Sequence, residues 1–117
     1  MYKLIVLFTR PADIAQFEDN WANKFMPYAE GMPGIRRVQV NTMVGTPDGP
    51  APYYKSHEFY FDSLADLYAA LDSDAGVKAG HALMSFAADL ATILYADVLE
   101  DDRHHPHLAL TPPNEGE

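Results

Sequence analysis

The chain has 117 residues, a formal net charge of −9 at pH 7 and no cysteine. A chain of this length forms one domain with one hydrophobic core and has no room for a separate cofactor domain. We expect no cofactor. The negative charge argues against nucleic acids and anionic membrane surfaces as partners, and the lack of cysteine excludes disulfides, thiolate catalysis and thiolate metal sites.

The first third of the chain predicts a strand, a helix and a second strand. Residues 3–9 form a nearly unbroken run of β-branched and aromatic residues, which is typical of a strand buried on both faces. Asp13 is a suitable cap for a helix whose apolar residues recur at helical spacing as far as Tyr28. Pro27 lies near the end of this helix, where it removes a backbone donor and should kink or loosen the last turn. Residues 35–44 alternate between apolar and polar side chains, which predicts a strand with one apolar face.

The following segments repeat the same order of elements. Residues 53–61 predict a third strand, and Ser63 is a natural cap for a second helix. The polar residues 72–74 interrupt the apolar stripe of this helix, and an alanine-rich helical stretch resumes over 75–90. The second helical layer is therefore expected to be broken in two. Residues 92–99 predict the fourth strand.

This double strand–helix–strand order predicts an α+β fold. It is the βαββαβ order of a ferredoxin-like sandwich, in which helices cover one face of a four-stranded antiparallel sheet. The two units are joined by the loop of residues 45–52, which is rich in glycine and proline. We expect the domain to cover residues 1–101, and residues 102–117 to form a tail or an extended arm. The other face of the sheet needs a cover, and a second copy of the chain is the simplest one.

Targeting and membrane segments are not evident. The apolar run of residues 4–8 is short and lacks a cleavage region, and no stretch approaches the ~20 apolar residues that span a bilayer. We therefore expect a soluble, cytoplasmic protein.

The face of the sheet turned away from the helices is the expected site. If Val6, Val38 and Leu94 meet the helices, alternation places a mixed set of side chains on the opposite face. This set comprises Ile5, Leu7, Thr9, Arg37, Gln39, Asn41, Ser56, Glu58, Tyr60, Ile93, Tyr95 and Asp97. Bulk water does not suit its apolar members, and a dry core does not suit its charged ones. A partly hydrated cavity closed by a second subunit fits both, while ordinary surface ion pairs at the strand ends are the alternative.

Five segments of the chain form a recognisable series. They are, in chain order, KLIVLFTRP, the Trp21 helix running into MPYAEGMPGIRR, the loop GTPDGPAPYY, the strand end FYFDS and the stretch Ser85-Phe86-Ala87. Together they resemble the EthD family. The resemblance implies a dimeric α+β barrel, and it links the chain to a family named for a protein encoded beside an ethyl tert-butyl ether degradation system. Relatives by fold include cofactor-free monooxygenases, isomerases and haem-dependent enzymes, so the fold implies no single reaction. Many EthD-like sequences carry a histidine two residues before the helix proline, where this chain has Phe25.

Two histidines are candidate acid–base groups, because histidine titrates near neutral pH. His57 lies on the third strand in phase with Phe59, on the helix side, and His81 lies on the second helical layer and is expected to point toward the sheet. The alternative for each is a purely structural role, as a buried histidine whose hydrogen bonds are made within the core. The tail histidines at 104, 105 and 107 lie near two aspartates, but their spacing matches no rigid motif, and we predict no metal site.

The candidate ligand-binding residues are aromatic or carry groups that hold oxygen atoms. They are Arg37, Gln39, Glu58, Tyr60, Tyr95, Asp97 and Trp21. Arg37 is suited to a carboxylate or enolate oxygen because its guanidinium stays charged when desolvated, although it also suits an ion pair with Glu58 or Asp97. Tyrosines orient an aromatic or oxygenated ligand, and they also serve as ordinary strand residues.

Two functions from different classes fit this pattern. The first is an EthD-like binding or accessory protein of small-molecule catabolism, which holds a small apolar or aromatic metabolite in the barrel of a homodimer. The second is a cofactor-independent monooxygenase, isomerase or cyclase that uses His57 or His81. A ligand-free dimerisation module and a haem-binding variant are further readings. Motifs for phosphate loops, Ser-His-Asp hydrolases and HExxH metal sites are absent from the sequence.

Overall fold

The computed structural model describes residues 1–100, and the expectations for the tail, including those for its histidines, lie outside the described residues. The elements follow one another as β1 (Tyr2–Thr9), α1 (Ile14–Asn20), η1 (Trp21–Phe25), α2 (Met26–Ala29), β2 (Arg37–Thr42), β3 (Tyr53–Phe61), α3 (Leu64–Asp72), α4 (Asp74–Ala87) and β4 (Ala91–Asp97). This order confirms the predicted α+β fold.

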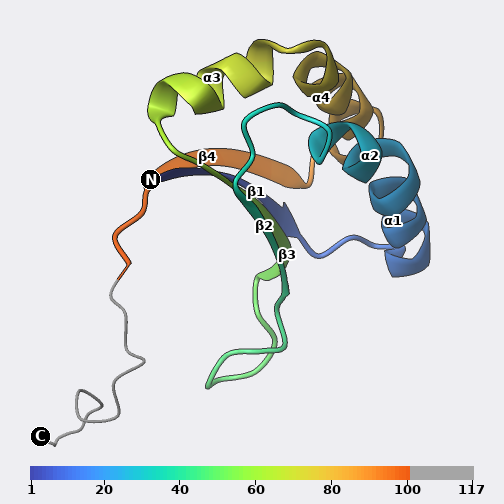
Figure 1. Ribbon diagram of the computed structural model, residues 1–117. Helices are drawn as coiled ribbons and strands as arrows, with labels where there is room; N and C mark the ends of the chain where they lie inside the picture. The colour runs from blue at the N-terminus through green and yellow to red at the C-terminus, as the bar shows by residue number, and fades with distance from the viewer. Residues whose placement is uncertain (101–117) are drawn as a thin grey trace, which may run out of the picture.

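The four strands form one antiparallel sheet in the order β2-β3-β1-β4. All the helices lie on one side of this sheet, as Figure 1 shows, and the loop after β2 extends beyond it on the other side. The sheet therefore has a helix-side face and an open face that residues 1–100 leave uncovered. None of the described helices is long and apolar enough to cross a membrane.

The first helical segment changes its winding in the middle. Between α1 and α2, the residues of η1 form a π-helical turn, in which the N–H of Met26 bonds to the carbonyl of Trp21 five residues earlier. Pro27 follows at once and has no N–H to donate, so the normal bond to the carbonyl of Asn23 cannot form. The predicted irregularity at Pro27 is thus present as a π-turn, a feature that often marks functional sites.

The break between α3 and α4 also matches the prediction. Ser73 ends α3 and caps α4, since its hydroxyl accepts a hydrogen bond from the N–H of Gly76 at 3.0 Å. The helix restarts in a new direction as a result, and its small residues then face the sheet.

The hydrophobic core fills the space between the helix-side face and the helices. Its fully buried large side chains are Phe8, Phe59, Phe61, Leu67 and Leu83. Phe17 joins the two layers, because its ring packs edge-on against Phe8 at 4.9 Å and against Tyr54 at 5.7 Å between ring centroids. These contacts fix α1 over β3 and β1.

The pairing register confirms the predicted faces for three strands and corrects the fourth. Lys3, Ile5 and Leu7 of β1 pair with Tyr60, Glu58 and Ser56, and β2 brings Arg37, Gln39 and Asn41 to the same open face. On β4, however, Ile93 pairs with Val6, and Tyr95 pairs with Leu4. Directly paired residues share a face, so Ile93, Tyr95 and Asp97 lie on the helix side, and Thr92, Leu94 and Ala96 on the open face. The expected faces of β4 were wrong.

Candidate functional site

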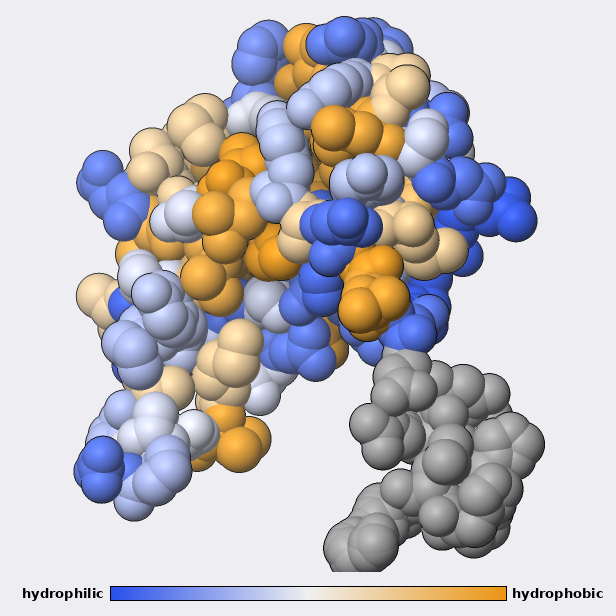
Figure 2. Space-filling model, turned by 90° about the vertical axis from the view of Figure 1, so that its left-hand side faces the viewer, coloured by the Kyte–Doolittle hydropathy of each residue, from blue (hydrophilic) through white to orange (hydrophobic). Residues whose placement is uncertain are grey.

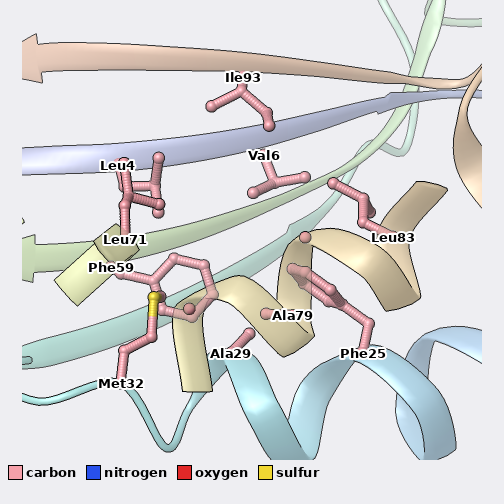
Figure 3. Close-up of a pocket in the computed structure, with 12 residues that line it drawn as sticks. Leu4, Val6, Phe25, Ala29, Met32, Phe59, Leu71, Ala79, Leu83 and Ile93 are labelled. Carbon is pink, nitrogen blue, oxygen red and sulfur yellow. The ribbon is translucent and has the colours of Figure 1, made fainter. Parts of the chain in front are cut away.

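A cavity of about 50 Å³ lies between the helix-side face of the sheet and the helices (Figure 3). Strands β1, β3 and β4 supply one wall, and η1, α2, α3, α4 and the segment after α2 supply the other. The lining residues are Leu4, Val6, Phe25, Ala29, Met32, Phe59, Leu71, Gly76, Ala79, Gly80, Leu83 and Ile93. None of these side chains carries a charge or a hydrogen-bonding group, so the cavity suits an apolar guest.

Small residues on α4 create this space. Gly76, Ala79 and Gly80 recur three and four residues apart, so they share the helix face that looks toward the sheet. Gly76 is small because α4 touches the end of α3 there: a Cβ would lie 2.6 Å from the carbonyl oxygen of Leu71. Gly80 is different, since a Cβ there would meet no atom of the described residues within 4 Å beyond its chain neighbours and the backbone of its own helix. The space beside Gly80 is therefore part of the cavity.

The cavity opens to solvent beside the edge strand β4. Ile93 lines it and is nevertheless 47% exposed, and Gly80, which also lines it, is only half-buried. This cavity was not predicted from the sequence, because Ile93 was expected on the open face. The Gly–x–x–Ala–Gly spacing of α4 was the only related signal in the sequence, and it shows small residues on one helix face without showing whether large residues opposite fill the space.

His57 is fully buried beside the cavity and does not reach it. Its Nδ1 accepts a hydrogen bond from Nε1 of Trp21 at 3.3 Å, and its Nε2 lies 3.0 Å from Oε2 of Glu30. The rings of Phe25 and Phe59 pack on the imidazole at centroid distances of 5.8 and 4.3 Å, and both rings line the cavity. They separate His57 from any guest.

The surroundings keep His57 neutral. Burial lowers the pKa of His57, this effect exceeds the opposing one of the Glu30 carboxylate, and the charge of Lys55 lowers the pKa further. Because an indole N–H is only a donor, Nδ1 must be the acceptor, and the proton resides on Nε2. Both ring nitrogens are thus occupied, which fits the structural reading of His57.

A second buried group lies next to Trp21. Nζ of Lys55 lies 3.6 Å from the centre of the Trp21 indole and 2.8 Å from Oε2 of Glu18, which also accepts a hydrogen bond from the hydroxyl of Tyr54 at 2.6 Å. A register shift between β1 and β3 at Phe8 lets the neighbouring Tyr54 and Lys55 reach the same carboxylate. Burial alone would raise the pKa of Glu18, but these hydrogen bonds hold it below the ordinary value.

The open face carries a connected polar cluster on β1, β2 and β3. Glu58 accepts hydrogen bonds from Nζ of Lys3 at 2.7 Å, from the hydroxyl of Ser56 at 2.9 Å and from Nδ2 of Asn41 at 3.1 Å. Burial by itself would raise the pKa of Glu58, but these donors outweigh it and keep the pKa below its ordinary value. The carboxylate is therefore ionised and satisfied within one protomer.

Tyr60 extends this cluster. Its hydroxyl donates to Oε1 of Gln39 at 2.8 Å, and its ring lies between Nζ of Lys3 at 5.3 Å and Cζ of Arg37 at 4.2 Å. Arg37 also forms a 3.3 Å ion pair with Glu100. Half-buried Ile5 and Leu7 lie beside the cluster. Figure 2 shows one side of the molecule, on which hydrophobic residues gather in the middle and hydrophilic ones lie around them.

The predicted site residues thus divide into separate groups. Arg37, Gln39, Glu58 and Tyr60 come together on the open face as expected, and Lys3 was a missed member of that cluster. The other predicted residues lie elsewhere: Tyr95 and Asp97 on the helix side of the β4 edge, Trp21 and His57 in the core, and His81 on α4. His81 is exposed and does not line the cavity, so its expected orientation toward the sheet was wrong.

Among residues 1–100, no three acidic or histidine side chains are arranged to hold a metal ion.

The fold and the two sites define a ferredoxin-like α+β protein with an apolar cavity under its helices and an open, partly polar sheet face. An EthD (ethyl tert-butyl ether) family protein from Bacillus halodurans is 32% identical to this chain, with a TM-score of 0.81 over 85% of this chain and 99% of that one. The chain therefore belongs to the EthD family. No family model matches it.

More distant proteins extend this comparison. An uncharacterized 11.0 kDa protein from the thcB-thcC intergenic region of Rhodococcus erythropolis is 27% identical over 97 residues, which are 83% of this chain and 94% of that protein. A dimeric ferredoxin-like protein of unknown function from Thermobifida fusca is 14% identical (TM-score 0.62, 83% and 90% of the two chains). A hydroxynitrile lyase from Passiflora edulis is 16% identical (TM-score 0.64, 86% and 95%). The last two share the fold alone.

Proposed function

We propose that this EthD family member is a binding protein of small-molecule catabolism in the cytoplasm, and that it holds a small apolar metabolite in the cavity under its helices. We further propose that it is an accessory to an oxygenase system that degrades ethers or similar compounds. The cavity supports the proposed binding of a metabolite, and the name of the family supports the proposed accessory role.

The uniformly apolar lining carries the proposal. Catalysis needs an acid, a base or a nucleophile within reach of the substrate, and none of the lining residues supplies one. The nearest candidate, His57, uses both ring nitrogens and lies behind Phe25 and Phe59. Binding is therefore better supported than turnover at this place. A volume of about 50 Å³ also favours an aliphatic group over an aromatic ring, because a cavity that holds benzene measures roughly 150 Å³.

Xenon is a suitable probe, because it enters dry apolar cavities of this kind. We expect saturable shifts of the methyl NMR signals of Leu83 and Ile93, and none at Leu99, which is fully exposed. The variant Gly80→Leu fills the cavity and should abolish the shifts, whereas His81→Leu adds the same side chain at the exposed neighbouring position and should preserve them. Xenon shifts that persist in Gly80→Leu, or that never saturate, would refute binding in the cavity.

We propose that the functional unit is a homodimer joined through the open face. Leu94 and the neighbouring Ile5 and Leu7 offer apolar contact area, and the Glu58 cluster is already hydrogen-bonded, so its burial would leave no unpaired charge. The description of the Thermobifida protein as dimeric supports the same assembly.

Sedimentation equilibrium tests this assembly. The wild type should have twice the mass of the chain, and Leu94→Glu on the open face should shift it toward the monomer. Val77→Glu is the matched control, because Val77 is equally exposed but lies on α4. A monomeric wild type, or an equal response of both variants, would speak against the open face as the interface.

A cofactor-independent monooxygenase, isomerase or cyclase is the alternative function. The observation that favours it is the position of Tyr60 between Lys3 and Arg37, where two cations would hold an enolate or carboxylate oxygen and the phenol would transfer a proton. Turnover of a phenolic, quinone or lactone substrate that is lost in Tyr60→Phe but kept in Tyr53→Phe would establish it. If no such substrate is converted, the binding function stands alone.

A further inference from the structure

His57 shares its packing partners with the cavity. The rings of Phe25 and Phe59 lie against the imidazole at centroid distances of 5.8 and 4.3 Å, and both rings also line the cavity (Figure 3). The residues paired with His57 on the neighbouring strands are Val6 and Val40, and Val6 lines the cavity as well. The fully buried imidazole therefore stands directly behind the cavity wall, and a displacement of its ring moves that wall.

The imidazole is held at both nitrogens, and the two contacts respond differently to a proton. Nε2 lies 3.0 Å from Oε2 of Glu30, and this contact becomes an ion pair when the ring is protonated. Nδ1 accepts the hydrogen bond of the Trp21 indole at 3.3 Å and has to give it up, since a protonated Nδ1 is itself a donor. Glu30 thus keeps hold of Nε2, and the repulsion falls on the side of Trp21.

The charged groups around His57 favour the same direction of movement. Glu30 faces the ring from the end of α2, and Lys55 faces it from β3. Nζ of Lys55 lies 3.6 Å from the centre of the Trp21 indole and is paired with Glu18 of α1. A positively charged imidazole is attracted by Glu30 and repelled by Lys55, so both charges draw it away from Trp21.

The element on the Trp21 side is the π-helical turn η1, which carries both Trp21 and Phe25. Pro27 has no N–H to close the next turn, so this part of the helix lacks one of the backbone hydrogen bonds of a regular helix. Phe25 is itself buried against the imidazole. Separation of η1 from the ring therefore moves Phe25 in the cavity wall.

The cavity is small enough for such a movement to decide whether a guest binds. A guest in a space of about 50 Å³ has only a few atoms and depends on its contact with each wall. A gap of about 0.5–1 Å at one wall forfeits roughly a quarter to a half of the dispersion energy of the contacts there. The protonated form of His57 is therefore expected to bind the guest weakly.

We propose that His57 is a proton switch for the cavity. With a neutral imidazole the cavity holds its apolar guest, and protonation parts the ring from Trp21, displaces Phe25 and releases the guest. The inference rests on the proposed function, because it assigns a regulation to the same binding site.

Xenon binding as a function of pH tests the switch. The methyl signals of Leu83 and Ile93 report xenon, and the imidazole nitrogen signals of His57 report its protonation. One pH unit below the pKa of His57, about one molecule in eleven keeps a neutral ring, so the apparent Kd for xenon should be about tenfold higher than at pH 7.5. A xenon affinity that is the same on both sides of the His57 titration overturns the proposal. Loss of xenon binding together with the far-ultraviolet circular dichroism also overturns it, because the proton then unfolds the chain instead of reshaping the cavity.

Variants assign the pH dependence to His57. His57→Gln can accept the indole hydrogen bond and does not titrate, so its affinity for xenon should stay constant over the same pH range. Glu30→Gln removes the carboxylate that raises the pKa of His57, so xenon release should move to lower pH. The control is His81→Gln, because His81 is exposed on α4 and does not line the cavity, and it should keep the wild-type profile. A profile as steep in His57→Gln as in the wild type contradicts the switch.

The wild type supplies a second test that needs no variant at His57. Because the guest favours the neutral ring, xenon must in turn weaken the binding of the proton to His57. At a xenon concentration ten times its Kd at pH 7.5, the proton affinity of His57 should fall about tenfold. An unchanged His57 titration in the presence of xenon refutes the coupling.

The same measurements separate the failure of this inference from the failure of the proposed function. The absence of saturable xenon shifts at pH 7.5 would refute binding in the cavity and the switch with it. Saturable shifts at pH 7.5 that do not respond to the protonation of His57 would leave the binding function in place and refute the switch alone.

Discussion

The indole N–H of Trp21 donates a hydrogen bond to Nδ1 of the buried His57 across 3.3 Å, and this one contact determines the state of the imidazole. A protonated imidazole would carry a hydrogen on Nδ1 that faces the indole hydrogen, so the contact exists only with neutral His57. The same contact joins η1 to β3. The π-helical turn that carries Phe25 into the cavity is therefore tied to the protonation state of His57.

The first prediction is that stability falls on acidification below the ordinary histidine pKa of 6.5. The pKa of folded His57 is lowered by burial, so between that pKa and 6.5 the unfolded chain binds a proton that the folded chain does not. The contribution of His57 is then complete above pH 6.5 and is lost below it, by about 1.4 kcal/mol per pH unit until the folded pKa is reached. Glu30 and Lys55 face the ring as well, with opposite effects on its pKa.

Urea unfolding between pH 7.5 and 5.5 measures this dependence, with the single tryptophan of the chain as the fluorescent reporter. In His57→Gln, whose amide both accepts and donates but does not titrate, the slope in this range should be shallower. A slope that is the same in both proteins would show that other groups control the acid response.

The second prediction concerns two glycines of α4 that differ only in their surroundings. Gly80→Ala should stabilise the protein by about 0.5–1 kcal/mol, because alanine favours the helix and its methyl group enters open space. Gly76→Ala should destabilise it by roughly 1–3 kcal/mol, because its Cβ would overlap the carbonyl oxygens of Ala70 and Leu71. Thermal unfolding of both variants checks this, and a shift of the same sign in both would contradict the packing of α4 on α3.

The third prediction is that the buried Lys55 is worth more than a surface ion pair. Lys55→Met should cost about 2 kcal/mol, because the substitution leaves Glu18 beside Tyr54 without its cation and removes the contact with the Trp21 ring. A double-mutant cycle with Glu18→Gln isolates the pair, and we expect a coupling of about 1 kcal/mol or more, since Glu18 itself is partly exposed. A coupling near zero would mean that only the packing of the lysine matters.

The sequence allowed the fold and three of the four strand faces to be predicted, and the reason is visible in the residues. β2 alternates between charged or amide residues and valine, as in Arg37, Val38, Gln39 and Val40, so its two faces differ in polarity. β4 reads ATILYAD, with apolar residues on both alternating sets, and only its pairing with β1 decides which set meets the helices.

The cavity was not predictable for a related reason. A helix pattern shows which face is buried, but it does not show whether the small residues of that face are matched by large ones opposite. Gly76 and Gly80 look alike in the sequence. The structure separates them, because one touches the end of α3 and the other borders empty space.

The last prediction addresses the histidine that the family resemblance led us to expect where this chain has Phe25. Phe25 is buried, lines the cavity and packs on His57, and no polar side chain of residues 1–100 lines the cavity beside it. Phe25→His should therefore cost about 2–4 kcal/mol, from lost apolar contact and an unpaired ring nitrogen. Phe25→Leu is the control, with an expected cost of about 1–2 kcal/mol from lost volume alone. If Phe25→His proves as stable as Phe25→Leu in urea unfolding at pH 7.5, the cavity admits water or a polar partner at this position. The purely apolar guest proposed for it would then have to be replaced by one with a hydrogen-bonding group near η1.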